Sequence, residues 1–289
     1  MADNPIVLSI AGFDPSSGAG VTADIKTIAA HGCYGVACVT ALTVQSTQRV
    51  RRVEPLNPRL VTSTLEELGA DFEISAVHIG MLGNGRVVRA VARFLERSKI
   101  PNVVLDPILK SSSGTTLLNR PGRKLLLDQL FPLATVSTPN AEEASVLTGM
   151  PVKGLEDMRG AAAKLHAQGA RAVVITGGEF EQATELLSVA PDSPVVGNAV
   201  PQGPIQQVFK SERQQSTSTH GTGCAFATAL ACHLALGRGL PEAVLLAKAY
   251  VSAAIANAVP IGRGTGPVHH LYRMDQSRRA ATAPERSEG

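Results

Sequence analysis

The sequence contains no tryptophan, and aromatic residues make up only 3% of its 289 residues. Aliphatic side chains must therefore fill the core, and the hydrophobic content of 44% is large enough for them to do so. Cysteine is also scarce: Cys33, Cys38, Cys224 and Cys232 show neither a CxxC pair nor the paired spacing of a zinc site. The cysteine pattern favours a protein whose thiols stay reduced.

Strong charge and long apolar runs are missing as well. The formal net charge is only +3, and no aromatic residues for stacking are interleaved with the arginines, which argues against a nucleic-acid partner. No apolar run reaches the length needed to span a membrane. The segment Met1–Pro5 has neither the basic nor the apolar region of a signal peptide. We therefore expect a soluble, cytoplasmic protein that binds neither nucleic acid nor membrane.

Short apolar runs alternate with helical patterns along the chain. The runs are rich in Val and Ile and apolar on both faces, as in strands covered by helices on both sides. The predicted strands are Ile6–Ala11, Gly35–Val44, Ala76–Leu82, Val103–Leu109, Thr135–Thr138 and Ala172–Thr176. The predicted helices are Val21–His31, Arg59–Leu68, Arg86–Arg97, Arg123–Leu130, Ala141–Leu147, Leu155–Gln168, Gly223–Leu236 and Leu240–Val259. Repeated βα units of this length predict an α/β fold with a doubly wound, mainly parallel sheet flanked by helices.

The pattern changes after the sixth predicted strand. Glu185–Val189 and Gln206–Lys210 are interpreted as antiparallel strands at the sheet edge, joined by a loop. The polar segment 275–289 shows no apolar periodicity and is expected to be a disordered tail. Because no internal repeat and no convincing linker is found, residues 1–274 are predicted to form a single domain.

The segment from Ser218 to Cys224 has two glycines one residue apart, directly before an apolar helix. Gly221 and Gly223 allow a tight turn that gathers backbone N–H groups at the positive end of the helix, which is a site suited to phosphate. Cys224 lies in the first helical turn, where the helix dipole favours the thiolate. An ordinary turn before a buried helix, with Cys224 as a small core residue, is an equal alternative on local pattern alone.

Distinctive polar residues follow most of the predicted strands. Ligands of open parallel sheets bind outside the carboxyl ends of the strands, and these residues fall there. The segments are Gly12–Gly20, Gln45–Thr47, Gly80-Met81, Asp106-Pro107 with Lys110, Pro139-Asn140 with Glu143, and Thr176–Gly178. None is a Walker A loop or a dinucleotide fingerprint. Their common position indicates one ligand-binding rim.

Taken together, these motifs resemble those of the hydroxymethylpyrimidine/phosphomethylpyrimidine kinases of thiamine biosynthesis, in order and from about Ile6 to Tyr272. The resemblance is carried by Ala11–Gly20 with Ala23–Thr27, Thr40–Thr47, Ile79–Leu82, Val103–Pro107, Thr138–Glu143, His220–Cys224 and Gly264–His270. It implies a ribokinase-like fold and an enzyme that phosphorylates 4-amino-5-hydroxymethyl-2-methylpyrimidine and then its monophosphate. It further implies MgATP as cofactor, a small pyrimidine as substrate, and a homodimer.

The resemblance also implies roles for individual residues on the substrate side. Cys224 would be the catalytic base, activated by a lowered pKa, while Gly221 and Gly223 would hold the transferring phosphoryl group. A structural alternative is that Cys224 only orients the substrate. The amide of Gln45 suits a ring nitrogen beside an exocyclic amino group. Further substrate contacts would come from Gly12, Met81 and Asp24, although a carboxylate early in a helix can also serve the helix dipole.

On the nucleotide side, the resemblance assigns Asp106 and Glu143 to Mg²⁺, with Asn140 beside them. Asn140 and Glu143 could equally be a helix cap. Thr176, Gly177 and Lys110 would contact ATP. Most relatives have Lys-Gly-Gly-His where this chain has Thr176-Gly177-Gly178-Glu179. The change removes a positive charge from the phosphate site, which Lys110 could restore.

Two rival functions remain open. A pyridoxal or pyridoxine kinase of the same superfamily also acts on a hydroxymethyl-bearing heteroaromatic ring, although Gln45 and Cys224 favour the pyrimidine. The missing lysine at position 176 instead suggests a non-catalytic, pyrimidine-binding regulatory protein. The intact loop from Gly221 to Cys224, with Asn140 and Glu143, counts against that second rival.

Overall fold

The described strands form one nine-stranded sheet in a computed structural model that describes residues 4–111, 114–191, 193 and 204–274. The sheet order is β3-β2-β1-β4-β5-β6-β7-β8-β9. The strands are β1 Ile6–Phe13, β2 Tyr34–Ser46, β3 Arg49–Pro55, β4 Ile74–Ile79, β5 Val103–Leu105, β6 Val136–Ser137, β7 Ala172–Gly177, β8 Gln182–Val189 and β9 Ile205–Glu212. The six strands from β2 through β1 to β7 pair in parallel, and β3, β8 and β9 are antiparallel. The predicted α/β fold with a mainly parallel sheet is confirmed.

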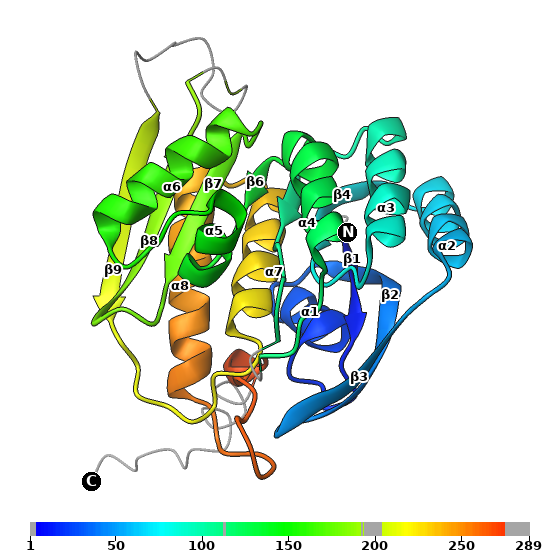
Figure 1. Ribbon diagram of the computed structural model, residues 1–289. Helices are drawn as coiled ribbons and strands as arrows, with labels where there is room; N and C mark the ends of the chain where they lie inside the picture. The colour runs from blue at the N-terminus through cyan, green and yellow to red at the C-terminus, as the bar shows by residue number, and fades with distance from the viewer. Residues whose placement is uncertain (1–3, 112–113, 192, 194–203, 275–289) are drawn as a thin grey trace, which may run out of the picture.

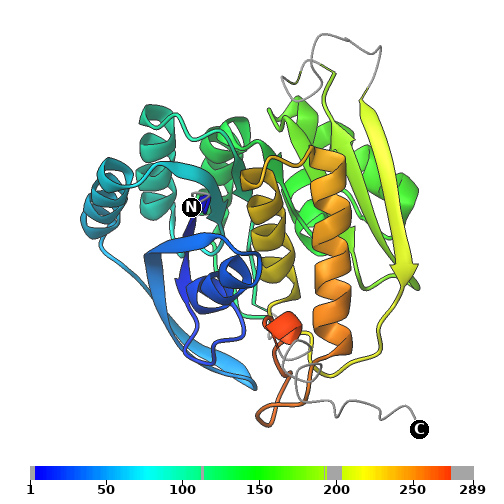
Figure 2. The same ribbon diagram turned by 180° about the vertical axis from the view of Figure 1, so that it is seen from behind.

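Helices cover both faces of this sheet. The face toward the viewer in Figure 1 carries α2 Pro58–Asp71, α3 Gly85–Arg97, α4 Arg120–Leu125, α5 Ala141–Thr148 and α6 Leu155–Ala167. A π-helical turn, Leu126–Leu130, and a 3₁₀ turn, Phe131–Leu133, follow α4. The opposite face carries α1 Gly20–Ala30, α7 Thr222–Ala235 and α8 Leu240–Ala256 (Figure 2). This two-sided cover explains why the central strands are apolar on both faces.

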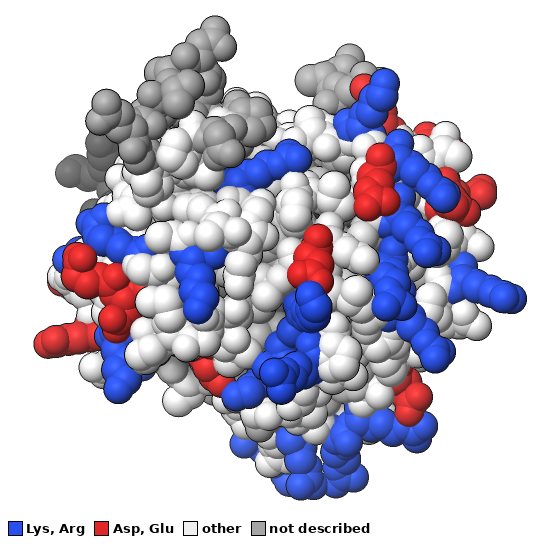
Figure 3. All heavy atoms as spheres, turned by 45° about the horizontal axis from the view of Figure 1, so that its top comes forward, with Lys and Arg blue, Asp and Glu red and all other residues white. Residues whose placement is uncertain are grey.

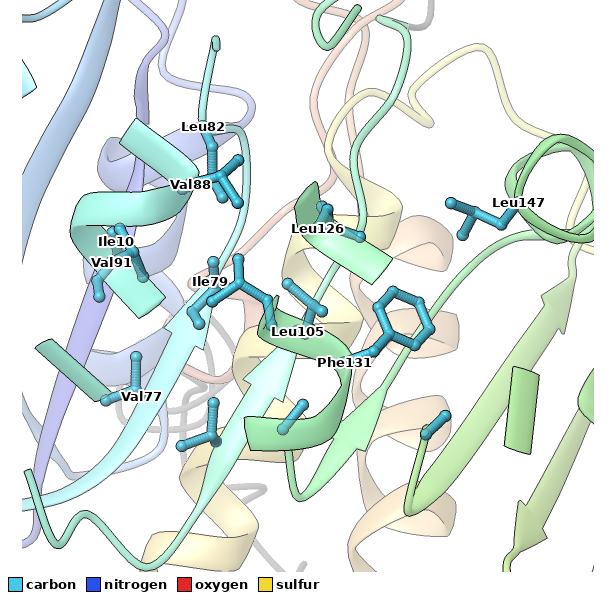
Figure 4. Packing of buried hydrophobic residues seen from close by; sticks show 14 of the residues in the cluster. Ile10, Val77, Ile79, Leu82, Val88, Val91, Leu105, Leu126, Phe131 and Leu147 are labelled. Carbon is cyan, nitrogen blue, oxygen red and sulfur yellow. The ribbon is translucent and has the colours of Figure 1, made fainter. Parts of the chain in front are cut away.

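The core is divided by the sheet into two layers. In one layer, Ile79 of β4 and Leu105 of β5 pack with Leu126 and Phe131 below the front helices (Figure 4). In the other, the sheet packs against the alanine-rich faces of α7 and α8, where Tyr250 is fully buried. Small side chains let these two helices lie close to the strands, so the low aromatic content does not prevent a dense core.

Two strands differ from the sequence-based prediction. The strand expected to continue to Leu109 ends at Leu105, because Pro107 has no N–H to donate to a neighbouring strand. Strand β3 was not predicted at all. Its exposed arginines interrupt the alternation of polar and apolar residues that marks a strand. It nevertheless pairs with β2 from Ala41↔Pro55 to Ser46↔Arg49. The two predicted edge strands, by contrast, are present as β8 and β9.

Four helices begin at an asparagine, whereas α7, like α1, α6 and α8, has no side-chain cap. The side chains of Asn57, Asn84, Asn119 and Asn140 accept hydrogen bonds from first-turn N–H groups of α2, α3, α4 and α5. Helix α7 starts at Gly221, which has no side chain to fill this role. The Thr222 N–H donates to the Thr219 carbonyl oxygen at 3.3 Å, so the N–H groups of Gly223 and Cys224 are the ones left for another acceptor.

Charge on the outer surface is mixed. On the face drawn in Figure 3, basic side chains gather near α3, whose exposed residues include Arg86, Arg89, Arg93 and Arg97, and acidic side chains lie among them. Among the described residues, none of the helices combines the length and apolarity needed to cross a bilayer. The predicted disordered tail, residues 275–289, lies outside the described residues, and the single domain stays a prediction.

Candidate active site

Two adjoining cavities open along the carboxyl ends of the parallel strands. The smaller, of about 450 Å³, is lined by Gly12, Gln45, Met81 and other residues near β1, β2 and β4. The larger, of about 1760 Å³, lies between the β7–β9 edge and α8. Residues that line both are Asn140, Thr176, Thr219, Thr222, Gly223 and Phe226. The N-terminus of α7 therefore stands where the two cavities meet.

Gly221 is required by the geometry of this junction. Its φ of 82° lies in the left-handed region, and a Cβ there would come within 1.8 Å of the Gly18 carbonyl oxygen. No other residue type fits without moving one of the two loops. The close approach packs the loop after β1 against the start of α7, and it leaves the helix N-terminus open toward the cavities.

A buried polar contact holds the same two loops together. His220 Nε2 lies 2.8 Å from Asp14 Oδ2, and both side chains are almost fully buried. Asp14 also accepts hydrogen bonds from Ser16 N at 2.8 Å and from Ala19 N at 3.0 Å. Although burial alone would raise it, the pKa of Asp14 is lowered by its hydrogen bonds with His220 and Ser16. Asp14 is therefore an ionised carboxylate that fixes the loop after β1.

Sequence reasoning gave neither Asp14 nor His220 a role, although both lie inside quoted motifs. Their positions in the sequence could have indicated a role, because Asp14 follows β1 and His220 precedes α7, and both segments were expected at the same rim. His220 Nε2 also lies 3.3 Å from Gln45 Nε2, so the contact extends to a predicted substrate residue.

The predicted substrate residues Gln45, Gly12 and Met81 are brought together in the smaller cavity. Thr43 Oγ1 donates to Gln45 Oε1 at 3.2 Å, which fixes one end of the amide. A Cβ on Gly12 would lie 2.2 Å from Met81 Cε, so the absence of a side chain at position 12 makes room for the Met81 thioether. The three residues thus form a part of the cavity wall that combines a polar amide with an apolar thioether.

Asp24, the fourth predicted substrate residue, lies elsewhere. It is fully buried and lines neither cavity. Its carboxylate accepts hydrogen bonds from Ser9 Oγ at 2.6 Å and from Thr228 Oγ1 at 2.8 Å, and lies 3.2 Å from His78 Nδ1. Asp24 therefore lies outside the predicted substrate surface in this structure, and its role in substrate binding stays a prediction. The residue joins α1, β1, β4 and α7 from within the core.

Cys224 lines the smaller cavity at the first turn of α7, as predicted, but its expected activation is contradicted. Burial raises the pKa of the thiol well above its ordinary value, and the nearby carboxyl groups of Asp106 and Asp24 raise it further. A hydrogen bond from the Gly20 backbone lowers it by less than these effects. Desolvation and like charge thus outweigh the helix dipole, and the thiol keeps its proton at neutral pH.

Asp106 and Glu143 are neighbouring buried carboxyl groups. Burial raises the pKa of Asp106 to about 7, against the opposing effect of His78. Burial and the charge of Asp106 raise the pKa of Glu143 to about 8. Glu143 and Asn140 form a complete capping box at the start of α5, with N–H···O distances of 3.0 and 2.8 Å. The capping alternative is thus confirmed.

This carboxylate pair suits a divalent cation. Mg²⁺ in phosphate sites commonly takes one or two protein carboxylates and completes its shell with water and phosphate oxygens. Among the described residues no cluster of three or more acidic, histidine or cysteine side chains could hold a metal by itself. A site made of Asp106 and Glu143 therefore depends on a phosphate ligand, and two buried, mutually repelling carboxyl groups are the chemistry that a cation would relieve.

The predicted nucleotide residues are only partly brought together. Thr176 lines both cavities. Gly177 lines neither, since a Cβ there would meet Phe180 and Met158, and its contact with the nucleotide stays a prediction. Lys110 lines the smaller cavity, but its ammonium forms a half-exposed ion pair with Glu142 at 2.5 Å. In this structure Lys110 is thus paired with Glu142, and its contact with ATP stays a prediction.

The chain matches the family described as phosphomethylpyrimidine kinase over residues 14–269. The chain belongs to this family. It is 38% identical over 273 residues to a hydroxymethylpyrimidine/phosphomethylpyrimidine kinase of Rhizobium meliloti, covering 93% of this chain and 97% of the relative. It is 39% identical over 272 residues to the thiamine biosynthesis bifunctional protein ThiED of Geobacter sulfurreducens. There it covers 94% of this chain and spans about half, 53%, of that longer relative.

Solved structures agree with this membership of the phosphomethylpyrimidine kinase family. A phosphomethylpyrimidine kinase of Clostridium difficile superposes with a TM-score of 0.74 at 33% identity, covering 87% of this chain and all of that one, 100%. An ADP complex of Bacillus subtilis pyridoxal kinase gives 0.82 at 33%, covering 94% and 99%. A Staphylococcus aureus pyridoxal kinase bound to AMP-PCP and pyridoxal gives 0.79 at 31%, covering 93% and 94%. The resemblance inferred from the motifs and the ribokinase-like fold are confirmed.

The raised pKa values of this family member predict an unusual dependence of stability on pH. A carboxyl group whose pKa is higher in the folded state stabilises the fold at low pH, and this stability is lost as pH rises through about 7 and 8. Without Mg²⁺, Asp106→Asn should raise the melting temperature more at pH 8 than at pH 5, because the stability lost by the native chain grows as pH rises from about 4 to about 7. The expected gain is about 2–4 °C for each kcal/mol recovered.

Differential scanning fluorimetry in EDTA measures this shift. Asp71→Asn, at an exposed carboxylate of α2, is the matched control and should show no pH-dependent gain. The same difference between Asp106→Asn and the native chain at pH 5 and pH 8 would contradict the buried-carboxyl account.

Proposed function

We propose that this chain uses ATP to phosphorylate 4-amino-5-hydroxymethyl-2-methylpyrimidine, and then the resulting monophosphate to the diphosphate, in thiamine biosynthesis. The observation that carries the proposal is the uncapped N-terminus of α7 at the junction of two cavities. A phosphoryl group passing between two bound molecules needs negative charge stabilised at one fixed place between them. The backbone N–H groups after Gly221 provide that place.

The smaller cavity fits the pyrimidine. Gln45 can donate to a ring nitrogen and accept from the neighbouring exocyclic amino group, because its amide carries both functions. Gly12 and Met81 offer a flat apolar contact for the ring. With the ring held against these residues, its hydroxymethyl group can lie beside Cys224, which lines the same cavity.

The larger cavity fits the nucleotide. Val251 and Ile255 of α8, with Phe226 of α7, give it an apolar wall against which a purine base can pack. Thr176 and the turn Thr222-Gly223 lie where this cavity meets the smaller one, so a triphosphate can extend from the base to the α7 terminus. Asp106 and Glu143 would hold Mg²⁺, which neutralises phosphate charge when it is bound.

Proton transfer is assigned to Cys224. The substrate alcohol must lose its proton as its oxygen joins the phosphorus, and the sulfur of Cys224 is placed to take it. Because the pKa of the thiol is raised, only a small fraction is thiolate at neutral pH, but that thiolate is a strong base. Positioning at the α7 terminus supplies the remaining rate enhancement.

A coupled assay of ADP formation tests the function. The purified chain with MgATP should consume ATP when the pyrimidine alcohol is present, and mass spectrometry should find the monophosphate followed by the diphosphate. Pyridoxal competes in a second arm, because pyridoxal kinases are among the similar structures. Higher kcat/KM for pyridoxal favours the vitamin B6 activity, and no turnover with either alcohol leaves a pyrimidine-binding regulatory protein.

We also propose that the chain acts as a homodimer through the outer face of β2. Phe13, Leu42 and Val44 are large apolar side chains that stay 36%, 48% and 55% exposed, and Phe13 pairs with Leu42 across adjacent strands. A second copy of the same face would cover them, and this region borders the substrate cavity through Phe13 and Thr43.

Introducing a charged side chain on this face tests the dimer prediction. Leu42→Glu should convert a dimer into a monomer in analytical ultracentrifugation, since burial of the new carboxylate is unfavourable. Leu245→Glu, at a residue 53% exposed on α8, should leave the mass unchanged. A native monomer, or a Leu42→Glu dimer of unchanged affinity, rejects this interface.

Removal of the Cys224 thiol should lower kcat for the first phosphorylation by about 10²–10⁴, the usual range for loss of a general base, with little change in substrate affinity. The native rate should rise with pH above neutrality, because the pKa of the thiol is raised. Cys224→Asp should retain more activity than Cys224→Ala and lose that rise. Near-normal turnover of Cys224→Ala in rapid-quench experiments would show that the thiol takes no part.

Gln45→Leu should weaken pyrimidine binding while leaving MgATP binding unchanged. Each unpaired hydrogen-bonding group of the ring costs about 1–3 kcal/mol, which is about tenfold or more in affinity. Isothermal titration calorimetry gives both constants. Gln48→Leu, at an exposed residue three positions along the same hairpin, is the control. Unchanged pyrimidine affinity in Gln45→Leu would place the ring elsewhere.

A further inference from the structure

A buried ion pair faces the larger cavity, and none of the roles described so far uses it. Lys248 of α8 and Glu185 of β8 both line this cavity, and their side chains are 9% and 10% exposed. The Lys248 ammonium donates to Glu185 Oε2 and, at 3.2 Å, to the Ala183 carbonyl oxygen. The ammonium is therefore held by two acceptors, and the buried pair still borders a cavity.

The pair lies directly beside Thr176. In the antiparallel pairing of β7 and β8, Thr176 stands opposite Glu185. Directly opposed residues point to the same face of a sheet, with Cβ atoms about 4.5–5.5 Å apart. Thr176 lines both cavities, so the Lys248–Glu185 pair stands one strand away from their junction.

Lys248 has one donor left for a ligand. An ammonium carries three N–H groups, and two of them point to Glu185 and Ala183 within the described part of the chain. Arg123 lines only the smaller cavity, and two other cations that line the cavities already have partners. Lys110 pairs with Glu142, and Arg213, at the exposed edge of the larger cavity, donates to the Glu179 carbonyl oxygen at 3.4 Å.

We propose that Lys248 donates this remaining hydrogen bond to a phosphate oxygen of the bound nucleotide, with Glu185 holding the ammonium in position. The inference rests on the proposed function, because it takes the larger cavity as the nucleotide site. It assigns the positive charge of this site to Lys248 of α8, because Thr176 of β7 offers only a hydroxyl. A purely structural ion pair would join α8 to β8 and have no effect on the nucleotide.

The two partners should respond in opposite ways. Lys248→Met should raise KM for MgATP about tenfold or more, the usual loss for a hydrogen bond to a charged group. It should also flatten the dependence of KM on ionic strength, because one cation is lost. Glu185→Gln should leave KM unchanged or lower it, since the ammonium is then less neutralised. Lys210→Met removes a lysine from exposed β9 outside both cavities and should change neither property.

A variant that moves the lysine to another position gives the most direct test. Thr176→Lys in the Lys248→Met background puts an ammonium across from Glu185 on the same face, and KM for MgATP should return toward the native value. The double variant Lys248→Met, Glu185→Gln keeps an uncharged pair of similar volume, so it separates loss of binding from loss of folding. It should show the same raised KM with a near-native melting temperature.

Calorimetry with MgADP on the same variants keeps this inference separate from the proposed activity. If the native chain does not phosphorylate the pyrimidine alcohol, MgADP affinities still decide whether Lys248 contacts the nucleotide. Equal losses of melting temperature in Lys248→Met and Glu185→Gln, with unchanged KM and MgADP affinity in both, would overturn the proposal. So would a failure of Thr176→Lys to restore affinity.

Discussion

The architecture of the site depends on the contact between the loop after β1 and the start of α7. Gly221 can lie against the Gly18 carbonyl oxygen only because it has no Cβ and adopts a left-handed conformation. The Asp14–His220 contact, buried on both sides, then locks the two loops. This constraint leaves α7 without a side-chain cap and aims its N-terminus at the junction of the cavities. The pyrimidine and nucleotide surfaces are arranged around that point.

Several acidic side chains are buried near the junction. Asp106 and Glu143 are buried close together, and with Asp24 they raise the pKa of the Cys224 thiol. Such a site is unfavourable for a triphosphate unless cations enter it. Mg²⁺ would balance the charge of the carboxylates. Lys248 supplies positive charge from α8, whereas β7 offers only Thr176.

Much of this site could be predicted from the sequence, because parallel strands bring their carboxyl ends to one rim. Gln45, Met81, Asp106, Asn140 and Thr176 line the cavities for that reason, and Cys224 joins them from the first turn of α7. Properties that depend on contacts between distant segments could not be predicted. The pKa of Cys224 is raised by burial and then by carboxyl groups from other elements, Asp24 faces the core, and Lys248 meets Glu185 only after α8 packs on β8. Strand β3 was missed because exposed arginines mask its period.

A ternary complex tests the central claim, that one molecule binds in each cavity with the α7 terminus between them. A crystal structure with the pyrimidine alcohol, Mg²⁺ and a non-hydrolysable ATP analogue gives the distance from the hydroxymethyl oxygen to the γ-phosphorus. The account predicts a near-attack separation of about 3–3.5 Å, with the γ-phosphate on the N–H groups after Gly221. A pyrimidine in the larger cavity, or a γ-phosphate directed away from α7, would contradict it.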